Sequence, residues 1–452
     1  MVTTIITTTI GKSVQNRNID VTTFTNTNPA FKIYIGCRQH GDEQESEEAG
    51  NRLITHITNN QSLYSTLTIA VCKLQNPDGK ALSQRETSQT IDMNRDHTLL
   101  SAPESKVIQS FLNTFKPDVW IDVHNFPPTA GFMTSVNKQF DCDVALDKCN
   151  NPATKRTLTT QQFKDLLNEL RAENPSYTYE WYLQASESGT VRHSTEAPHD
   201  ARNGGALRFN CLGFIMEGRE ARSDEVFATQ EEITTAGQTA MLILLIKYLK
   251  NHSWLFITPP KKLAVGETVS LKSGTDEEEN FTLKAYDNTS HTVSDYTFTN
   301  VDTTNKSTAN TTAVTAYAVP SNLTKVITLL TDHGIIGADG KVTDKYEIEK
   351  LKFGSSTSTA TATKSNKSDF TGYKIYRVID DAAQGRFLNY FLEPLAEYGI
   401  TEYTTELSLP IAANTNYSIL RLTKNLNGQS VPCVPPSGCN KGCPLHCECY
   451  GK

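Results

Sequence analysis

The chain has 452 residues, 37% hydrophobic and 21% charged, which is long enough for two or more folded units with a polar surface. A formal net charge of −7 and the lack of any Lys/Arg-rich run argue against the phosphate-contacting surface that nucleic-acid binding needs. The longest apolar run, residues 241–246, is far too short for a membrane-spanning helix.

The first 250 residues alternate between predicted strands and predicted helices. Apolar runs and two-residue alternation predict strands at residues 31–36, 65–74, 119–123 and 213–216. Helical periodicity predicts helices at residues 43–56, 103–115, 160–172 and 225–250. Strands separated by helices predict an α/β fold with a mixed, mostly parallel central sheet flanked by helices.

The composition changes near residue 260. Residues 261–312 are rich in Thr, Asn, Ser and Asp with alternating apolar positions, which predicts a β-rich second unit. A helix near residues 323–330 and a strand at 346–353 follow, and the Ser/Thr/Lys stretch at 355–368 is expected to be a loop or linker. The expected domains are therefore residues 1–253, a mixed extension at 254–425 and a Cys-rich tail at 426–452.

The ten cysteines fall into two groups. Those of the first half are expected to be buried small hydrophobic residues. Those of the tail are dense enough for a disulfide-linked knot or a second metal site, and these two alternatives stay open. The tail group contains His446 and five cysteines, Cys433, Cys439, Cys443, Cys447 and Cys449.

The beginning of the chain lacks the basic start and apolar centre of a secretory leader. No leader is visible, but a mature chain would look the same, so the compartment stays open. Abundant Thr and Asn and the Cys-rich end favour an extracellular location.

Three residues that follow predicted strands have the character of zinc ligands. His40 and Glu43 are three residues apart on a turn that enters a helix, and His124 directly follows the strand at 119–123. Two imidazoles and a carboxylate form the ligand set of a catalytic zinc that keeps a fourth position for water. The alternatives are an acidic helix start for the first pair and a core histidine for His124.

Glu217 closes the apolar strand at 213–216. In an open α/β sheet, ligands bind beyond the carboxyl ends of the strands, where this carboxylate would meet the three metal-ligand candidates. A carboxylate beside a metal-activated water can take its proton and pass it to a leaving amine. The alternative is a structural ion pair with Arg219.

A further set of residues makes a resemblance specific. The chain resembles the zinc metallocarboxypeptidase family typified by the pancreatic enzymes, and a weaker similarity extends to the C-terminal extension of some bacterial members. The resemblance covers roughly residues 8–250 and implies the family's phosphorylase/hydrolase-like fold. It rests on motifs in the family's order: His40-x-x-Glu43, Asn76-Pro-Asp-Gly79, Arg85, Asp92-x-Asn94-Arg95, His124 and Glu217-x-Arg219.

The resemblance implies a role for each of these residues. His40, Glu43 and His124 would bind one catalytic Zn²⁺, and Asp92 would hydrogen-bond the back of His40. Arg85 would stabilise the oxyanion, with a solvated loop charge as the alternative. Asn94 and Arg95 would hold the terminal carboxylate of a peptide substrate. Glu217 would be the general base.

The chain departs from the family in two places. No counterpart of the family's loop tyrosine stands in the stretch 199–205, and His124 is followed by Asn-Phe-Pro-Pro. Arg202 lies with other basic residues in the region that shapes the specificity pocket in relatives. A basic pocket would favour an acidic or diaminopimelate-type C-terminal residue, and ordinary surface charges are the alternative. The group comprises Arg192, His193, Arg202 and Arg208.

The leading function is therefore hydrolysis of a C-terminal peptide bond by zinc-activated water, on a peptide with a free terminal carboxylate. One alternative is an amidohydrolase or deacylase acting on cell-wall peptides or acylated amino acids. Another is a non-catalytic binding or surface-assembly protein that retains the metal site. The sequence leaves the oligomeric state open.

Overall fold

The computed structural model describes residues 4–126, 138–149, 151, 153–154, 156–185, 191–193, 197–220, 227–256, 260–287, 289–340 and 345–425. The chain divides into two compact units, one of Met1–Pro260 with Ser273–Thr308 and one of Lys261–Lys272 with Ala309–Lys452. The extension expected at residues 254–425 is thus shared between the two units. The tail at 426–452 lies outside the described residues.

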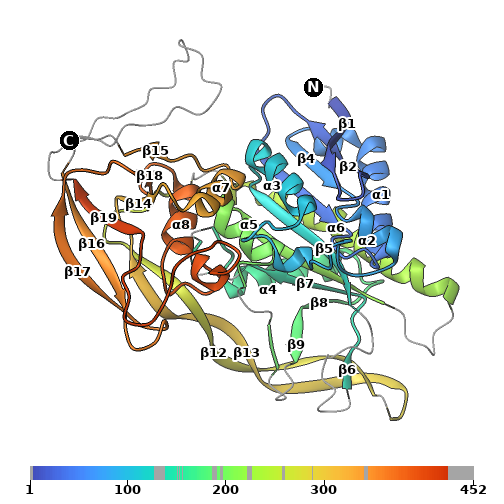
Figure 1. Cartoon of the computed structure of the whole chain (residues 1–452). Coiled ribbons are helices and arrows are strands. Elements are labelled where there is room, and N and C mark those ends of the chain that lie inside the picture. Colours follow the sequence, from blue (N-terminus) through green and yellow to red (C-terminus); the bar gives the residue numbers. More distant parts are fainter. Residues whose placement is uncertain are drawn as a thin grey trace. The chain divides into compact units, whose positions relative to one another are not determined.

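The described part of the first unit is built on an eight-stranded sheet (Figure 1). Its order is β1-β2-β4-β3-β5-β11-β7-β8. The pairs β3/β4, β3/β5, β5/β11 and β7/β8 are parallel, and the other neighbours are antiparallel, which confirms the mixed sheet. The strands are β1 (Thr4–Lys12), β2 (Asn18–Thr25), β3 (Phe31–Cys37), β4 (Leu67–Cys72), β5 (Val119–Phe126), β7 (Val144–Lys148), β8 (Tyr179–Trp181) and β11 (Leu212–Arg219).

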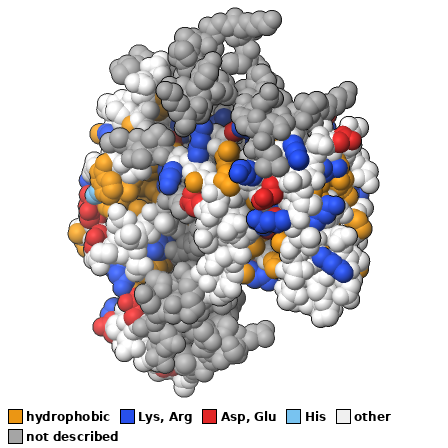
Figure 2. All heavy atoms as spheres, turned by 90° about the vertical axis from the view of Figure 1, so that its left-hand side faces the viewer, with side chains coloured by type: hydrophobic (Ala, Val, Ile, Leu, Met, Phe, Trp, Pro, Cys, Tyr) orange, Lys and Arg blue, Asp and Glu red, His pale blue; other side chains and the backbone are white. Residues whose placement is uncertain are grey.

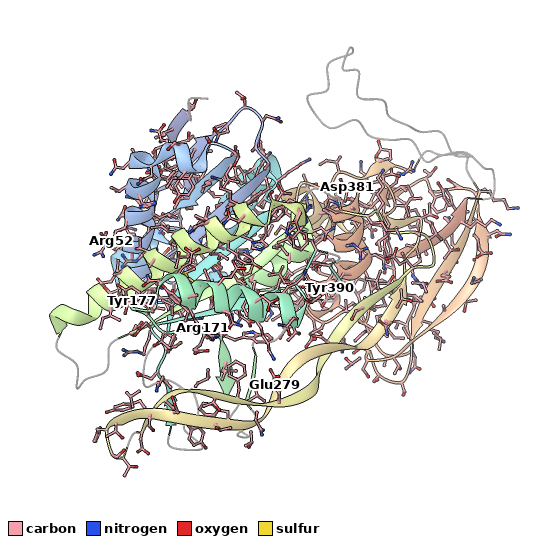
Figure 3. The ribbon with its side chains drawn as sticks, turned by 180° about the vertical axis from the view of Figure 1, so that it is seen from behind. Arg52, Arg171, Tyr177, Glu279, Asp381 and Tyr390 are labelled. Carbon is pink, nitrogen blue, oxygen red and sulfur yellow. The ribbon has the colours of Figure 1, made fainter. Side chains whose placement is uncertain are left out.

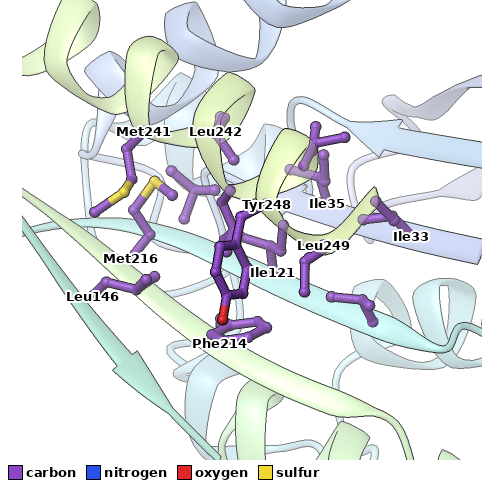
Figure 4. Packing of buried hydrophobic residues seen from close by; sticks show 14 of the residues in the cluster. Ile33, Ile35, Ile121, Leu146, Phe214, Met216, Met241, Leu242, Tyr248 and Leu249 are labelled. Atoms are coloured by element: carbon purple, nitrogen blue, oxygen red, sulfur yellow. The ribbon is translucent and has the colours of Figure 1, made fainter. Parts of the chain in front are cut away.

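Helices cover both faces of this sheet because the side chains of its central strands alternate in direction. Ile33 and Ile35 of β3 pack into the core under three helices, as Figure 4 shows for part of this cluster, whereas Tyr34 faces the opposite core. The first face carries α1 (Gln44–Asn59), α4 (Thr160–Glu173) and α6 (Phe227–Asn251), and the second carries α3 (Pro103–Phe115) and α5 (Ala201–Phe209).

Short helical elements connect these layers. They match no long periodic segment of the sequence, because a single turn leaves almost no periodic signal. They are η1 (Gln61–Tyr64), α2 (Pro77–Leu82), η2 (Met93–Arg95) and η4 (Ser253–Phe256).

Two long strands, β12 (Thr268–Asp287) and β13 (Thr292–Thr312), form the β-rich region expected from residue 261 onward. Glu279 of β12 connects to α4, because Lys164 Nζ lies 2.8 and 2.9 Å from its carboxylate oxygens (Figure 3). Three short strands complete this five-stranded sheet: β6 (Lys138–Phe140), β9 (Leu183–Ala185) and β10 (Val191–His193).

The second unit contains a six-stranded sheet among its described residues, in the order β15-β18-β14-β19-β16-β17. The helix near 323–330 and the strand at 346–353 are confirmed. The other elements are α8 (Ala382–Phe391) and η5 (Ile400–Tyr403). The elements already expected are α7 (Thr324–Asp332) and β16 (Tyr346–Phe353), and the remaining strands are β14 (Ala316–Pro320), β15 (Ala338–Asp339), β17 (Ala360–Lys367), β18 (Tyr373–Arg377) and β19 (Leu420–Asn425).

The prediction of a loop at residues 355–368 is wrong for most of that stretch. Ala360–Lys367 forms β17, which pairs antiparallel with β16 from Tyr346↔Lys367 to Phe353↔Ala360. Its sequence, Ala-Thr-Ala-Thr-Lys-Ser-Asn-Lys, is almost wholly exposed at the edge of the sheet. Low complexity hid the strand, since β-branched Thr fits a pleated surface and polar side chains suit an exposed edge.

The described part of one face of the molecule is mixed in charge. On the face shown in Figure 2, Lys and Arg side chains are interspersed with Asp and Glu. Within the described part of the chain, no helix combines the length and apolarity needed to cross a bilayer.

Candidate active site

The structure brings the three predicted metal ligands together. His40 Nδ1 lies 2.5 Å from Glu43 Oε1, and His124 Nδ1 lies 3.0 Å from Glu43 Oε2. The two Nδ1 atoms are 3.1 Å apart. All three side chains are buried, and one ligand atom from each lies within 4.8 Å of the others. The expected convergence around one ion is therefore present in the geometry.

The topology of the sheet explains this convergence. β3 and β5 are adjacent and parallel, with Cys37 opposite Val123 near their carboxyl ends. His40 lies in the turn that leaves β3, and Glu43 is the residue before α1. His124 lies within β5, two residues before its carboxyl end, so the ligands meet at one edge of the sheet.

The electrostatics of the cluster suit a bound cation. Burial opposes the charge of Glu43, but the imidazoles of His40 and His124 outweigh it and lower the pKa of Glu43 to about 2. Burial also disfavours a charged His124, yet Asp122 and Glu43 raise its pKa well above the usual value. The negative charge of the carboxylates thus favours positive charge at the imidazoles. A divalent metal ion bound by neutral imidazoles would supply that positive charge. The residues present fit zinc.

Both imidazoles have a carboxylate behind them. His40 Nε2 lies 3.3 Å from Asp92 Oδ1, where Asp92 was expected. His124 Nε2 lies 2.7 Å from Asp122 Oδ2, a contact that sequence analysis missed. The signal was present, because side chains two residues apart on a strand share a face. Asp122 was interpreted only as part of an apolar strand.

Arg85 and Arg95 lie on the accessible side of the cluster. Arg85 donates from Nε to Asp92 Oδ2 at 3.1 Å, and its Nη1 lies 3.1 Å from His40 Nδ1. Arg95 is exposed, and its Nη1 donates to the Asn94 carbonyl oxygen at 2.7 Å. Both guanidinium groups are placed where an anionic group could reach them.

Asn94 is more enclosed than Arg95. Its Oδ1 accepts a hydrogen bond from the Ala201 backbone N–H at 2.8 Å, and its Nδ2 lies 3.2 Å from His124 Nε2. Asp92 caps the same turn by accepting from the Asn94 N–H at 2.8 Å. Asn94 thus fixes the turn that carries Arg95, and its Oδ1 already has a protein partner.

Glu217 lies beside the metal cluster on β11. The register of β5 and β11 sets Glu217 opposite His124. The side chain is 7% exposed, and burial together with Glu43 raises the pKa of Glu217 to about 7, although His124 opposes the shift. No described residue hydrogen-bonds its Oε2 atom. The alternative of an ion pair with Arg219 is disfavoured, because Arg219 Nε lies 3.5 Å from Asp141 Oδ1.

Arg202, by contrast, does not join the cluster. Its Nη1 donates to Asp147 Oδ2 at 2.8 Å and to the Lys148 carbonyl oxygen at 3.1 Å, and the pair is buried. Asp147 neutralises the guanidinium, so these contacts contradict the expectation of an available basic pocket residue. Arg208 is also buried and stacks on Phe209. The side chains of Arg192 and His193 lie outside those that the structure describes.

The Asn-Pro-Asp-Gly segment braces the turn that carries His40. Asn76 Oδ1 accepts from the Gly79 N–H at 2.8 Å and caps α2, while its Nδ2 donates to the Gln39 carbonyl oxygen at 3.2 Å. Gly41 packs directly on Gly79, because a Cβ on Gly41 would lie 2.1 Å from the Gly79 carbonyl carbon. A residue without a Cβ is therefore needed at Gly41, where these backbones meet.

The cysteines of the first half are buried and free, as expected: Cys37, Cys72, Cys142, Cys149 and Cys211. The tail cysteines lie outside the described residues.

Comparisons with known proteins bear on the family of the chain. The profile of the zinc carboxypeptidase family matches residues 3–242. Carboxypeptidase 2 of Trichophyton rubrum is 30% identical over 204 residues, which cover 42% of this chain and 37% of that protein. Carboxypeptidase 2 of Trichophyton tonsurans is 22% identical over 198 residues, with the same coverage of 42% and 37%. The chain thus spans well under half the length of these curated relatives.

Solved structures of low identity were also found. A metallo-carboxypeptidase from Burkholderia cenocepacia has a TM-score of 0.39 and 16% identity, with 54% of this chain and 65% of that chain covered. One from Pseudomonas aeruginosa has a TM-score of 0.38 and 17% identity, covering 53% and 65%. The family profile spans more than half of the 452 residues, and on that ground the chain belongs to the zinc carboxypeptidase family.

Proposed function

We propose that this protein is a zinc-dependent carboxypeptidase that hydrolyses the C-terminal peptide bond of a peptide with a free terminal carboxylate. One observation carries the proposal: His40, Glu43 and His124 converge beside buried Glu217, whose Oε2 has no hydrogen-bond partner among the described residues. His40 Nδ1, His124 Nδ1 and the Glu43 carboxylate would hold the ion. When bound, zinc supplies a Lewis acid that polarises a carbonyl and activates water.

Glu217 would act as the proton carrier. Its unpartnered carboxylate oxygen can accept a proton from the attacking water and return it to the leaving amine. Burial keeps this carboxylate away from bulk water, and the neighbouring carboxylate of Glu43 favours its protonated form. Both effects support a group that exchanges a proton near neutral pH.

The two arginines would bind the substrate. Exposed Arg95 can engage both oxygens of a terminal carboxylate with its planar guanidinium. Arg85, held by Asp92 next to His40, can donate to the oxygen that gains charge as the carbonyl is attacked. The amide of Asn94 supports Arg95 through its turn.

A pair of variants tests the proton-transfer step. Glu217→Gln should retain one equivalent of zinc at the cluster and lower kcat about 10²–10⁴-fold, because the amide cannot accept the proton. Glu220→Gln is the matched control, since Glu220 is a nearby carboxylate outside the cluster, and its kcat should stay near wild type. Undiminished hydrolysis by Glu217→Gln would contradict the assigned role.

A set of peptides tests the reaction itself. Blocked dipeptides ending in Glu, Lys or Phe should be cleaved only with a free C-terminal carboxylate, and chelation should stop cleavage until zinc is restored. Arg95→Met should raise KM about 10–100-fold on the free acids, because a charge-assisted contact is lost. Equal cleavage of amidated and free peptides would favour the amidohydrolase alternative, and no cleavage with zinc bound would favour the binding-protein alternative.

A further inference from the structure

The two nitrogens of His124 face different environments. Nδ1 points to the cluster, 3.0 Å from Glu43 Oε2, while Nε2 lies 2.7 Å from Asp122 Oδ2. Both members of the rear pair are buried, with His124 1% and Asp122 0% exposed. His124, a candidate metal ligand, therefore contacts a carboxylate that solvent does not reach.

The rear pair is fixed by the strand. Asp122 and His124 stand two residues apart on β5, so their side chains leave the same face of the sheet. A short hydrogen bond within a strand needs no loop to hold it. The orientation of His124 is thereby built into the central sheet.

Asp122 is held in turn by a buried amide. Gln39 Nε2 lies 3.3 and 3.4 Å from the two Asp122 oxygens, and Gln39 Oε1 accepts a hydrogen bond from His97 Nε2. With Oε1 occupied by His97, the amide nitrogen can only donate to Asp122. Burial lowers the pKa of His97 to about 4, which keeps it neutral, and its contact with the Gln39 Oε1 acceptor places its hydrogen on Nε2.

The direction of these bonds assigns the tautomer of His124. A carboxylate only accepts, so Nε2 of His124 must carry the hydrogen that it donates to Asp122. The Nδ1 lone pair is then free and faces the cluster. Asn94 Nδ2, at 3.2 Å from Nε2, is a donor and cannot replace this bond.

Asp122 differs from Asp92, which supports the other imidazole. Arg85 pairs with Asp92 at 3.0 Å, and the Asp92–His40 contact is longer, at 3.3 Å. Among the residues that the structure describes, no Lys or Arg pairs with Asp122. Within the described part of the chain, Asp122 contacts the amide of Gln39 and the imidazole of His124, so it acts on His124 without a competing cation there.

We propose that Asp122 is a positioning residue that holds His124 by Nε2–H, so that the Nδ1 lone pair faces the metal site and donates more strongly. This inference rests on the proposed function only in requiring that the cluster binds zinc. Carboxylates behind metal-ligating histidines commonly have this effect, and their loss weakens metal binding about 10–100-fold.

The test is zinc affinity, measured by competition with a chromophoric chelator on the full chain. Asp122→Asn keeps the size of the side chain and removes its charge, and it should weaken zinc binding about 10–100-fold. His124→Ala measures zinc held elsewhere on the chain. The cobalt form of Asp122→Asn should also show a changed visible spectrum, which mere destabilisation would not produce in the folded protein.

Asp147→Asn is the matched control. Asp147 is equally buried, lies on β7 of the same sheet and accepts from Trp181 Nε1 at 2.6 Å. This variant should lose stability and keep wild-type zinc affinity and cobalt spectrum. If Asp122→Asn does not fold, Gln39→Met removes only the supporting amide and should weaken zinc binding roughly three- to tenfold.

The outcomes separate the two proposals. Zinc affinity within twofold of wild type in folded Asp122→Asn, with an unchanged cobalt spectrum, would overturn the role of Asp122 and leave the proposed function intact. The same result for Gln39→Met would overturn it if the first variant does not fold. Wild-type protein that binds no more zinc than His124→Ala would overturn the proposed function and this inference together.

Discussion

Each unit of the chain contains buried carboxylates, and the two groups differ in how their charge is balanced. In the second unit, Arg421 Nε lies 3.0 Å from Glu393 Oε1 and its Nη1 lies 2.5 Å from Glu349 Oε2. The Tyr317 hydroxyl also donates to Glu393. Arg421 therefore pairs with both carboxylates, and Lys364 Nζ lies 3.7 Å from Glu349 Oε1 as a second cation.

The candidate active site is balanced differently. Four carboxylates gather around two imidazoles, and among the described residues only Asp92 has an arginine partner, Arg85. Among these residues, Glu43 contacts the two histidines, Asp122 contacts His124 and the Gln39 amide, and one Glu217 oxygen has no hydrogen-bond partner. In the second unit, the negative charges are neutralised by cations of the protein itself, and such pairing serves the fold. In the candidate active site, the carboxylates outnumber the protein's own cations, which indicates a bound metal ion. The four are the buried Glu43, Asp122 and Glu217 and the partly exposed Asp92.

The largest effect on stability is expected in the second unit, where an arginine of the protein neutralises the carboxylates. Arg421→Met leaves buried Glu393 without its cation and should lower the free energy of unfolding by about 3–5 kcal/mol in urea titrations. Arg52→Met is the surface control, because Arg52 and Glu48 are partly exposed and 3.5 Å apart (Figure 3). It should change stability by less than ~0.5 kcal/mol. An equal loss of unfolding free energy for Arg421→Met and Arg52→Met would contradict the stabilising role assigned to the buried pair.

The second largest effect on stability is expected from zinc binding at the candidate active site. At about 1,000 times its dissociation constant, zinc should raise the free energy of unfolding by about 4 kcal/mol, since it binds the folded site. His40→Ala should abolish this increment, as measured by thermal unfolding with and without chelator. An increment that survives in His40→Ala would place the stabilising zinc elsewhere.

A smaller effect is expected where the ligand turn meets the Asn-Pro-Asp-Gly segment. Gly41→Ala adds a Cβ 2.1 Å from backbone and should cost about 1–3 kcal/mol and weaken zinc binding, because the turn carrying His40 must shift. Gly274→Ala meets only the Thr308 methyl at 2.7 Å and is the milder control. Chemical denaturation and chelator competition measure both. Unchanged zinc affinity in Gly41→Ala would show that the turn is not needed to place His40.

The smallest effect concerns pH. Burial lowers the pKa of His97 to about 4 in the folded chain, below the value near 6.5 expected when unfolded. The unfolded chain therefore binds the proton more readily, and stability falls as pH decreases below about 6.5. His97 alone should contribute a loss of about 1 kcal/mol between about pH 7 and about pH 5.5. His97→Gln should show a shallower pH dependence, and an identical slope would contradict a neutral, buried His97.

Much of the fold follows from the sequence because the central strands are continuous apolar runs. β3, β5 and β11 are buried on both faces, and the helices between them carry clear periodicity, so their order and mostly parallel pairing are predictable. The metal-ligand candidates follow for the same reason, since they stand at the carboxyl ends of β3 and β5. β17 was missed because its Thr-rich sequence lacks an apolar face and becomes a strand through pairing with β16.

The remaining part of the site depends on contacts between distant residues. Arg202 was expected to bind substrate because it is basic and lies in the region that shapes the specificity pocket in relatives. Its partner Asp147 stands on β7, and only the folded chain brings the two side chains together. Asn94 matched the family motif, while the structure shows that its Oδ1 already accepts a hydrogen bond from the Ala201 backbone N–H. Asp122 was predictable from strand geometry alone. Pairwise burial of polar groups is therefore the least predictable feature.

The central claim is that His40, Glu43 and His124 share one zinc ion, and anomalous diffraction at the zinc absorption edge tests it most directly. Crystals of the full chain grown with zinc should show a strong anomalous peak bonded to His40 Nδ1, His124 Nδ1 and the Glu43 carboxylate. The peak should be absent from crystals of Glu43→Gln treated with chelator. Zinc-loaded crystals with no peak between these three side chains, or with anomalous density only elsewhere on the chain, would contradict the account.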